Sequence, residues 1–211
     1  MKAFIFDLDG VIVFTDKFHY KAWKQMADEM GIYFDETINN RLRGVSRMAS
    51  LEIILEKYEG EPLSQERKIE LAGKKNDIYR EYLSTMTLDD VSEDVRKTLT
   101  ELRLKGYKLA IGSSSRNAKY ILERVGIKDM FDAVSDGTNI TNSKPDPEVF
   151  VKAAEFLGEA PSDCYVVEDA YAGIDAAKAG GMCAVGIGDA AGYDKADFRI
   201  NRFEELLKLP S

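Results

Sequence analysis

The sequence DLDG at residues 7–10 contains the first side chains whose types and spacing could do chemistry. It follows the apolar run AFIF at residues 3–6, which is typical of a buried β-strand. Alternation along a strand places Asp7 and Asp9 on one side and Leu8 on the other. In a parallel sheet, both carboxylates would stand at the edge where open α/β folds bind ligands. The alternative interpretation is a pair of solvated aspartates in a turn. The pair alone does not distinguish this interpretation from a ligand-binding one.

A second acidic pair favours the functional interpretation. Glu168 and Asp169 end the apolar run CYVV and are predicted to reach the same edge of the sheet. Four carboxylates at one edge repel each other unless a cation neutralises them. Hard oxygen ligands with positions left for water and phosphate suit Mg²⁺. The sequence therefore predicts a Mg²⁺ site with Asp7, Asp9, Glu168 and Asp169 as candidate ligands.

Two further segments supply groups that bind a phosphoryl group. Lys144 stands just before the sequence PDP, and the run GSSSRN occupies residues 112–117. Each has a simpler explanation, because an isolated lysine is usually solvated and a serine run before residues 116–125 is typical of a helix N-cap. A helix N-terminus with exposed N–H groups is itself an anion site. Together with the acidic pairs, these segments favour phosphoryl chemistry.

The elements that must position these groups follow an α/β pattern. Short β-type runs alternate with helical patterns, which is typical of a parallel sheet with helical crossovers. Strands are predicted at residues 3–6, 107–112, 132–135, 164–168 and 183–188, and helices at 92–105, 116–125, 147–157, 171–179 and 203–208.

Residues 16–85 interrupt this alternation. Only helical periodicity occurs there, as in KFHYKAWKQMADEMG and QERKIELAGKKNDIYREYL. The chain is therefore predicted to form an α/β core from residues 1–15 and 86–211, with an all-helical insertion at residues 16–85.

Composition narrows the functional class. Hydrophobic residues make up 45% of the 211 residues and charged residues 31%, which is typical of a globular protein. The net charge of −8 argues against a protein that grips nucleic acid along a basic face. The N-terminus lacks the apolar segment of a signal peptide, and no apolar run approaches the ~20 residues of a membrane-spanning helix. We expect a cytoplasmic monomer without nucleic-acid or membrane partners. A reduced, buried pair is favoured over a disulfide for Cys164 and Cys183.

The motifs resemble those of the haloacid dehalogenase superfamily. DLDGV follows the first strand, Ser113 the second, Lys144 precedes a proline, and the Glu168–Asp169 pair follows a later strand, in the family's order. The resemblance covers the whole chain. It implies a Rossmannoid parallel-sheet core, an aspartyl-phosphate mechanism and a helical cap inserted after the first motif.

The core residues then have definite expected roles. Asp7 is expected to attack phosphorus, because a carboxylate can carry a covalent phosphoryl group. Asp9 is expected to give and take the proton of the reacting hydroxyl. Mg²⁺, held by Asp7, the carbonyl of Asp9 and the acidic pair, would spread the charge on the transferring oxygens. Lys144 and Ser113 would bind the remaining oxygens.

Within the superfamily, the chain most resembles the β-phosphoglucomutases. The signals are HYKAW at 19–23, GVSR at 44–47 followed by Ser50, KKND at 74–77 and SSSRN at 113–117. This resemblance implies a second set of site residues, in addition to the core groups. These are Thr15 and His19 as catalytic residues and Trp23, Gly44, Val45, Ser46, Arg47, Ser50, Lys75, Ser114, Ser115, Arg116 and Asn117 as substrate-binding residues.

Three of these residues have a stated role and a simpler alternative. The resemblance implies that Arg47, with residues 115–117, clamps the phosphate that is not transferred. It also implies that His19 assists the hinge at Thr15 and that Lys75 faces the sugar. The alternatives are an exposed charge for Arg47, a packed helix residue for His19 and a solvated helix charge for Lys75.

The chain departs from the family at four positions. Val13 and Phe14 stand where the family has a polar residue and an aspartate, and Ala170 replaces a common serine. Arg116 stands where the mutases have lysine, which keeps the charge and offers a planar fork for phosphate. None of the four is an inferred catalytic group.

The implied reaction is the Mg²⁺-dependent interconversion of β-D-glucose 1-phosphate and glucose 6-phosphate through an aspartyl-phosphate enzyme and a glucose 1,6-bisphosphate intermediate. A phosphatase of small sugar or nucleoside phosphates with the same core is the first alternative. A catalytically silent sugar-phosphate-binding protein is the second. Glucose, another hexose and a phosphorylated disaccharide all stay open as the sugar.

Overall fold

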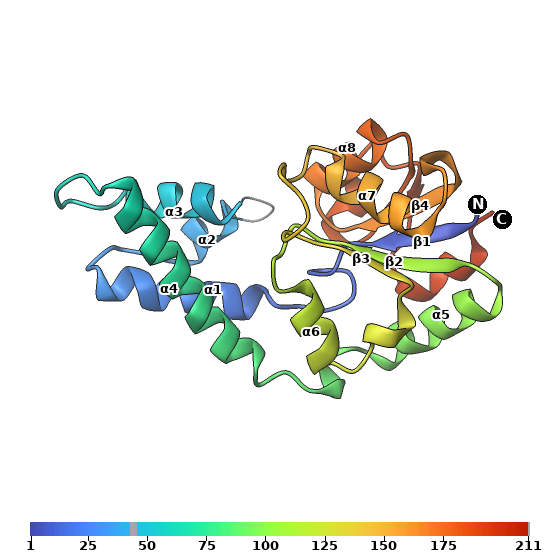
Figure 1. Cartoon of the computed structure of the whole chain (residues 1–211), viewed down its shortest axis with the longest axis horizontal. Helices are drawn as coiled ribbons and strands as arrows, with labels where there is room; N and C mark the ends of the chain where they lie inside the picture. The colour runs from blue at the N-terminus through green and yellow to red at the C-terminus, as the bar shows by residue number, and fades with distance from the viewer. Residues whose placement is uncertain (43–45, 211) are drawn as a thin grey trace. The chain divides into compact units, whose positions relative to one another are not determined.

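The computed structural model describes residues 1–42 and 46–210 (Figure 1). Over these ranges the chain divides into two compact units. Residues Met1–Phe14 and Met86–Ser211 form the first, called here the α/β unit, and Thr15–Thr85 form the second, called the helical unit. Gly44 and Val45, which were predicted to bind substrate, lie outside the described residues.

One parallel sheet is the centre of the α/β unit. In the described part of the chain it has six strands in the order β3-β2-β1-β4-β5-β6. Strand β1 pairs on one side with β2, where Phe6 lies opposite Ile111, and on the other with β4, where Phe6 lies opposite Val167. The strand that precedes Asp7 is therefore central. The strands are β1 (Ala3–Phe6), β2 (Lys108–Gly112), β3 (Ala133–Ser135), β4 (Cys164–Glu168), β5 (Cys183–Gly186) and β6 (Phe198–Arg199).

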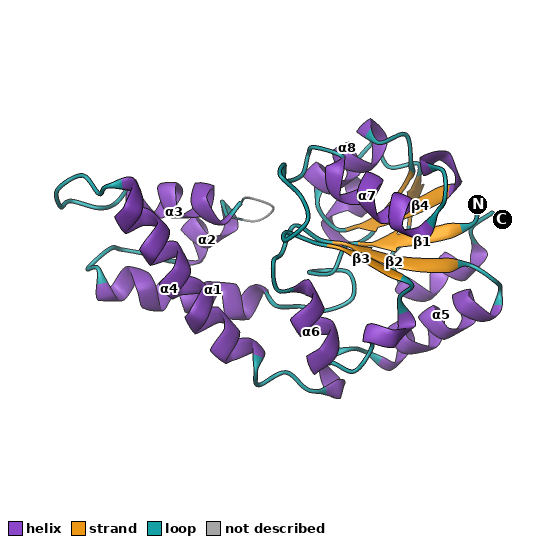
Figure 2. Ribbon diagram, in the orientation of Figure 1, coloured by secondary structure: helices purple, strands orange, loops and turns teal. Residues whose placement is uncertain are grey.

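Helices cover both faces of this sheet. Figure 2 shows α7 (Glu148–Leu157) and α8 (Tyr171–Ala179) on one face and α5 (Glu93–Leu104) on the other. A shorter helix, α6 (Ala118–Arg124), follows β2. The predicted parallel α/β core is confirmed. The segment 203–208 was predicted as an α-helix, but Phe203–Lys208 forms a 3₁₀-helix, and β6 was not predicted.

Strand β1 is buried on both faces, which explains its unbroken apolar sequence. Ala3 and Ile5 pack into the cluster formed with α7 and α8. Phe4 and Phe6 face the other way, where the Phe4 ring lies 4.9 Å from that of Tyr165 and the Phe6 ring lies 5.6 Å from that of Phe203. Side chains of both layers therefore hold in place the strand that ends at Asp7.

The helical unit has its own hydrophobic core. Trp23 and Met26 on α1 pack with Leu51 and Ile54 on α3 and with Leu71 on α4. Its helices are α1 (Asp16–Glu29), α2 (Glu36–Asn40), α3 (Arg47–Leu55) and α4 (Gln65–Leu83). Among the described residues, none of the helices has the length and apolar character needed to cross a bilayer.

Polar caps define where the longer helices of this unit begin. Ser46 accepts a hydrogen bond from the N–H of Ala49 at 3.3 Å, so α3 begins at Arg47. Ser64 does the same for Arg67 at 3.2 Å at the start of α4. A serine side chain at this position satisfies one of the backbone donors that a helix leaves unpaired. Ser46, a predicted substrate residue, is therefore the N-cap of α3.

Candidate active site

Three carboxylates meet at the carboxyl edge of the sheet. Asp7 directly follows β1 and continues its pairing, because its N–H donates to the carbonyl of Val167 at 3.0 Å. Glu168 is the last residue of β4, and Asp169 follows it. Among the described residues, Asp7, Glu168 and Asp169 form a group whose ligand oxygens all lie within 4.8 Å of one another. Residues far apart in sequence converge here because β1 and β4 are neighbours.

Lys144 bridges two of these carboxylates. Its ammonium lies 2.6 Å from Oδ1 of Asp7 and 2.5 Å from Oε1 of Glu168. The other oxygen of Glu168 accepts from the N–H of Ala170 at 2.8 Å. The Lys144 side chain is buried and also lies 4.6 Å from the centre of the Phe150 ring. The alternative interpretation of Lys144 as a solvated surface lysine is therefore wrong.

The charges at this edge do not balance. Burial disfavours the charged form of Lys144, but Asp7 and Glu168 outweigh it and raise the pKa of the ammonium. Burial raises the pKa of Asp7 well above its usual value, against the opposing effect of Lys144. Burial and the neighbouring Glu168 raise the pKa of Asp169 to about 7. Three acids share one ammonium, so a further cation would relieve the repulsion that remains.

The donor set fits Mg²⁺. Its oxygens are hard ligands, and Glu168 is already engaged by Lys144 and a backbone N–H, which leaves Asp7 and Asp169 as the more open carboxylates. Gly10 makes room for Asp169, because a Cβ built on Gly10 would lie 2.1 Å from Oδ2 of Asp169. Gly10 also has a φ of 94°, which side chains disfavour. The backbone beside the carboxylates therefore carries no side chain at position 10.

Asp9, the second aspartate of DLDG, is close enough to the three-carboxylate group that its charge helps to raise the pKa values of Asp7 and Asp169. Its backbone forms a bridge with Val13, and the N–H of Gly10 donates to the Val13 carbonyl at 2.7 Å. These contacts turn the chain sharply after DLD. Binding of Mg²⁺ by the Asp9 carbonyl stays a prediction, as does the role of Asp9 as acid and base.

The serine loop, residues 113–117, follows β2 at the same edge of the sheet. Ser113 is buried and donates its N–H to the carbonyl of Ser135 on β3 at 3.1 Å. Its hydroxyl accepts from the N–H of Ser115 at 3.2 Å, and the Ser115 hydroxyl accepts from the N–H of Asn117 at 3.2 Å. The alternative interpretation of the serine run as the cap of a helix at 116–125 is wrong, because α6 begins only at Ala118 and its N-cap is Asn117. The serines instead shape the loop itself.

Lys75 occupies the interior of the helical unit. Only 3% of it is exposed, and its ammonium lies 2.9 Å from Nδ1 of His19. The same ammonium lies 4.7 Å from the centre of the Trp23 ring and 4.6 Å from that of Tyr79, which are cation–π distances. The alternative interpretation of Lys75 as a solvated helix charge is wrong.

His19 is held in its neutral form. The surrounding protein atoms desolvate its ring, and Lys75 and Arg47 add positive charge, so its pKa is well below the usual value. Because an ammonium only donates, Nδ1 of His19 is the acceptor and Nε2 carries the hydrogen. The ring stacks on Tyr79 with centroids 4.0 Å apart. The Tyr79 hydroxyl donates to Oγ1 of the buried Thr15 at 3.2 Å, so the two predicted catalytic residues of this unit share one neighbour.

Arg47 is oriented by a residue that the sequence reasoning missed. Its Nη2 donates to Oδ1 of Asn76 on α4 at 2.8 Å. Asn76 lies within KKND, the same segment that contains Lys75, so the resemblance of this segment could also have indicated Asn76. Tyr79 was missed as well, although its spacing of four residues from Lys75 places both on one face of α4. Ser50, one turn after Arg47, is buried.

Both cysteines are free. Cys164 is buried, as expected, whereas Cys183 is only partly buried, so the predicted buried pair is half wrong. Burial raises the pKa of both thiols to about 11. A thiol with such a pKa is a poor nucleophile, and neither cysteine belongs to the site.

The fold and this edge together define a class of protein. A doubly wound parallel sheet that gathers carboxylates and a buried lysine at its carboxyl edge is an α/β enzyme of the Rossmann-like type. A family model described as haloacid dehalogenase-like hydrolase matches residues 1–181. The chain belongs to this family, and the resemblance drawn from DLDGV, Ser113, Lys144 and the acidic pair is confirmed.

Relatives within the family transfer phosphoryl groups. The chain is 42% identical to the β-phosphoglucomutase of Bacillus subtilis strain 168, over 98% of this chain and 92% of that protein. It resembles the crystal structure of β-phosphoglucomutase from Clostridium difficile with a TM-score of 0.89 and 37% identity, covering 98% and 93% of the two chains. It is 33% identical to the fructose-1-phosphate phosphatase of Escherichia coli strain K12, over 87% and 94%. The chain is therefore a phosphoryl-transferring enzyme of this family.

Proposed function

We propose that the protein is a Mg²⁺-dependent β-phosphoglucomutase that interconverts β-D-glucose 1-phosphate and glucose 6-phosphate. The pairing of Lys144 with Asp7 at the carboxyl edge carries the phosphoryl-transfer part of this proposal. The similarity to the mutase of Bacillus subtilis, which extends through the helical unit, supports the choice of mutase. The presence of Arg47, His19 and Lys75, which the resemblance assigns to the cap, agrees with that choice.

Asp7 attacks the phosphorus of a glucose bisphosphate and forms an aspartyl phosphate, while the sugar oxygen leaves. Asp9 protonates that leaving oxygen and later takes the proton of the hydroxyl that attacks the aspartyl phosphate. Lys144 holds Asp7 in place through the 2.6 Å contact and offers positive charge to the transferring oxygens. Ser113, buried at the end of β2, binds another of these oxygens.

Asp7 and Asp169, with the carbonyl of Asp9, are the proposed ligands of Mg²⁺, and Glu168 supports them. When bound, the ion supplies positive charge to the phosphoryl oxygens. Burial and neighbouring carboxylates raise the pKa values of Asp7 and Asp169 although Lys144 opposes the change, and a further cation at these oxygens would favour their charged forms.

The helical unit selects the acceptor. A mutase must favour a sugar hydroxyl over water at ~55 M, which requires a site that is complete only with a sugar phosphate bound. Arg47 is the proposed ligand of the phosphate that is not transferred, and its contact with Asn76 fixes the guanidinium. Neutral His19 assists the hinge at Thr15, and the buried ammonium of Lys75 is a polar group for the sugar.

Hydrolysis is the second candidate, because a relative of 33% identity is a phosphatase. Phosphorus NMR separates the two. Purified protein is mixed with β-glucose 1-phosphate, Mg²⁺ and a catalytic amount of glucose 1,6-bisphosphate, with Asp7→Asn as the matched control. Glucose 6-phosphate that appears faster than inorganic phosphate supports the mutase. Inorganic phosphate alone would show that the protein is a phosphatase.

A further inference from the structure

A buried carboxylate outside the three-carboxylate group lies beside the serine loop. Asp136 directly follows β3, and only 1% of it is exposed. Its Oδ1 accepts two hydrogen bonds from Thr138, one from the N–H at 2.9 Å and one from the hydroxyl at 2.5 Å. This is an Asx-type turn, in which the side chain fixes the backbone two residues on.

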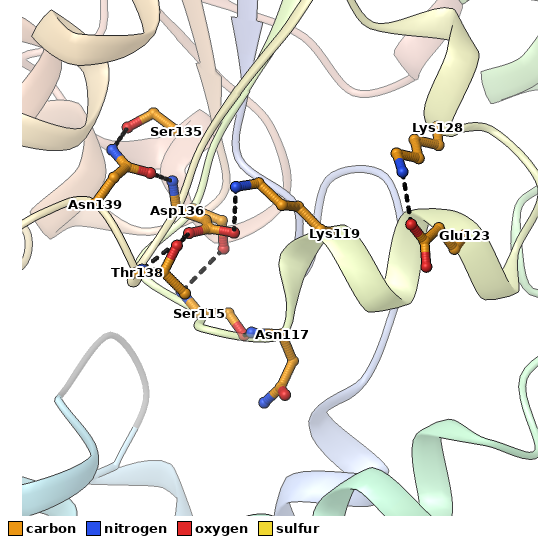
Figure 3. A network of polar contacts seen from close by, with 10 residues as sticks. Ser115, Asn117, Lys119, Glu123, Lys128, Ser135, Asp136, Thr138 and Asn139 are labelled. Carbon is orange, nitrogen blue, oxygen red and sulfur yellow. Dashed lines mark hydrogen bonds and ion pairs between the residues drawn. The ribbon is translucent and has the colours of Figure 1, made fainter.

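The turn is closed by a second set of hydrogen bonds, shown in Figure 3. The N–H of Asp136 donates to Oδ1 of Asn139 at 2.7 Å, and Nδ2 of Asn139 donates to the hydroxyl of Ser135 at 3.0 Å. Lys152 on α7 donates to the carbonyl of Asn139. Residues 135–139, called here the β3 clasp, are therefore held by their own side chains and by α7.

The β3 clasp lies directly against the backbone of the serine loop. The carbonyl of Ser135 accepts from the N–H of Ser113, and the N–H of Gly137 donates to the carbonyl of Ser115, each at 3.1 Å. Gly137 leaves no space, because a Cβ on it would lie 2.5 Å from the carbonyl oxygen of Ser114 and 3.0 Å from the nitrogen of Arg116. A shift of the clasp must therefore move the loop.

Stability alone does not explain why an aspartate stands at position 136. Its Oδ2 is buried and accepts no hydrogen bond from any described residue, and the Lys119 ammonium lies 4.0 Å from it. A buried carboxylate oxygen that accepts no hydrogen bond lowers the free energy of unfolding, whereas a small apolar residue at the same position would not. The carboxylate does accept two hydrogen bonds from Thr138 at Oδ1, and these stabilise the β3 clasp.

We propose that Asp136 is a positioning residue for phosphate binding. Through Thr138 and Gly137 it fixes the backbone of residues 115–117, and so sets where the loop meets the phosphate that is not transferred. This inference rests on the proposed function for the identity of the ligand. It adds a residue that lies outside the motifs by which the site was found.

Asp136→Ala tests the proposal, with Asp136→Asn as its matched control because asparagine keeps the Oδ1 acceptor. In Asp136→Ala we expect KM for β-glucose 1-phosphate to rise ~10-fold or more and kcat to change less than ~3-fold. Phosphorylation of Asp7 by acetyl phosphate should stay within ~2-fold, since it needs no second phosphate. Asp136→Asn should return KM to within ~3-fold of wild type.

Amide hydrogen exchange reports on the loop without any reference to activity. The amides of Ser115, Gly137 and Thr138 should exchange ~10-fold faster in Asp136→Ala than in wild type, while those of β1 stay protected. If wild type fails to isomerise the sugar phosphate, the proposed function is lost, and this exchange result still decides whether Asp136 holds the loop. Thr138→Val, which removes only the hydroxyl donor, should give a smaller change of the same kind if Asp136→Ala does not fold.

Three results would overturn the proposal. One is an unchanged KM and unchanged exchange at residues 115–117 in folded Asp136→Ala. Another is an equal loss with sugar phosphate and with acetyl phosphate, since that would mean that Asp136 supports the whole α/β unit. Equal defects in Asp136→Ala and Asp136→Asn would also contradict it, because the negative charge rather than the Oδ1 acceptor would then matter.

Discussion

The Lys144 ammonium lies 2.6 Å from Oδ1 of Asp7, although 137 residues separate the two in sequence. The residue proposed to attack phosphorus is thus paired with a buried cation. The same cation lies 2.5 Å from Glu168, so one side chain relieves the repulsion between two strands' terminal acids.

Removal of this cation should affect both stability and chemistry. Lys144→Met keeps the length of the side chain but leaves two buried carboxylates facing each other. We expect the free energy of unfolding at pH 8 in EDTA to fall by about 3 kcal/mol or more, as in other broken buried ion pairs. Phosphorylation of Asp7 by acetyl phosphate should fall ~10²-fold or more. Chemical denaturation and phosphoenzyme formation measure the two effects. Unchanged stability would mean that the ion pair does not form.

The metal should bind more tightly as the pH rises. Burial raises the pKa of Asp169 to about 7, so the carboxylate competes with protons through neutral pH. Calorimetric titration with Mg²⁺ should show an affinity that weakens by up to ~10-fold per pH unit below 7. A dissociation constant that is the same at pH 5.5 and pH 8 would contradict the placement of Asp169 among the ligands.

The metal-free protein should show the opposite trend in stability. The folded state keeps the Asp169 proton up to a pH of about 7, whereas the unfolded chain loses it near its usual pKa of 3.8. The folded state therefore binds more protons in this window, and the free energy of unfolding should fall as pH rises through it. Denaturation in EDTA at several pH values checks the sign, and added Mg²⁺ should remove the decline. Asp169→Asn should flatten the dependence.

Asp9→Asn should separate metal binding from proton transfer. The proposed Mg²⁺ contact uses the main-chain oxygen of Asp9, so affinity for the ion should be retained. Turnover should drop ~10²-fold or more, the scale of a lost general acid and base. Asp7→Asn, the control, should abolish every phosphoryl activity because an amide does not form the acyl phosphate. Near-wild-type mutase rates in either variant would refute the mechanism.

Arg47→Ala should distinguish the mutase from a phosphatase. If Arg47 binds the phosphate that is not transferred, kcat/KM for the mutase reaction should fall ~10²-fold or more. Hydrolysis of a small aryl phosphate has no second phosphate, so it should change less than ~5-fold. Arg41→Ala is a matched control, because Arg41 pairs with the exposed Glu56 at 2.8 Å and has no proposed ligand. Equal losses on both substrates would assign Arg47 to the fold instead.

The core of the site could be predicted because the relevant rule is local. The residues at the end of a parallel strand lie at the carboxyl edge of the sheet, so the positions of Asp7, directly after β1, and of Glu168, at the end of β4, could be predicted from two apolar runs. Lys144 follows a polar loop, and the local sequence of a loop does not determine where its side chains lie. Its position became clear only from the ion pairs with β1 and β4.

Burial of polar side chains was harder to predict. On α4, Lys75 lies in a sequence with charges at many positions, and helical periodicity alone does not separate a solvated lysine from a buried one. Rings from two helices, Trp23 on α1 and Tyr79 on α4, shelter its ammonium. Asp136 was missed for a similar reason, because SDGTN is typical of any exposed turn. Strand β6 has two residues, too few for alternation to be visible.

The central position of β1 also bears on how the protein is made. The segment AFIF leaves the ribosome well before its two partners, β2 at Lys108–Gly112 and β4 at Cys164–Glu168. Such pairings close long loops and form slowly. We expect the helical unit, which is a compact unit formed by one continuous segment, Thr15–Thr85, to fold before β4 is available to pair with β1. During that interval an apolar strand with two unpaired edges is exposed, and such a strand is prone to aggregate and to engage chaperones.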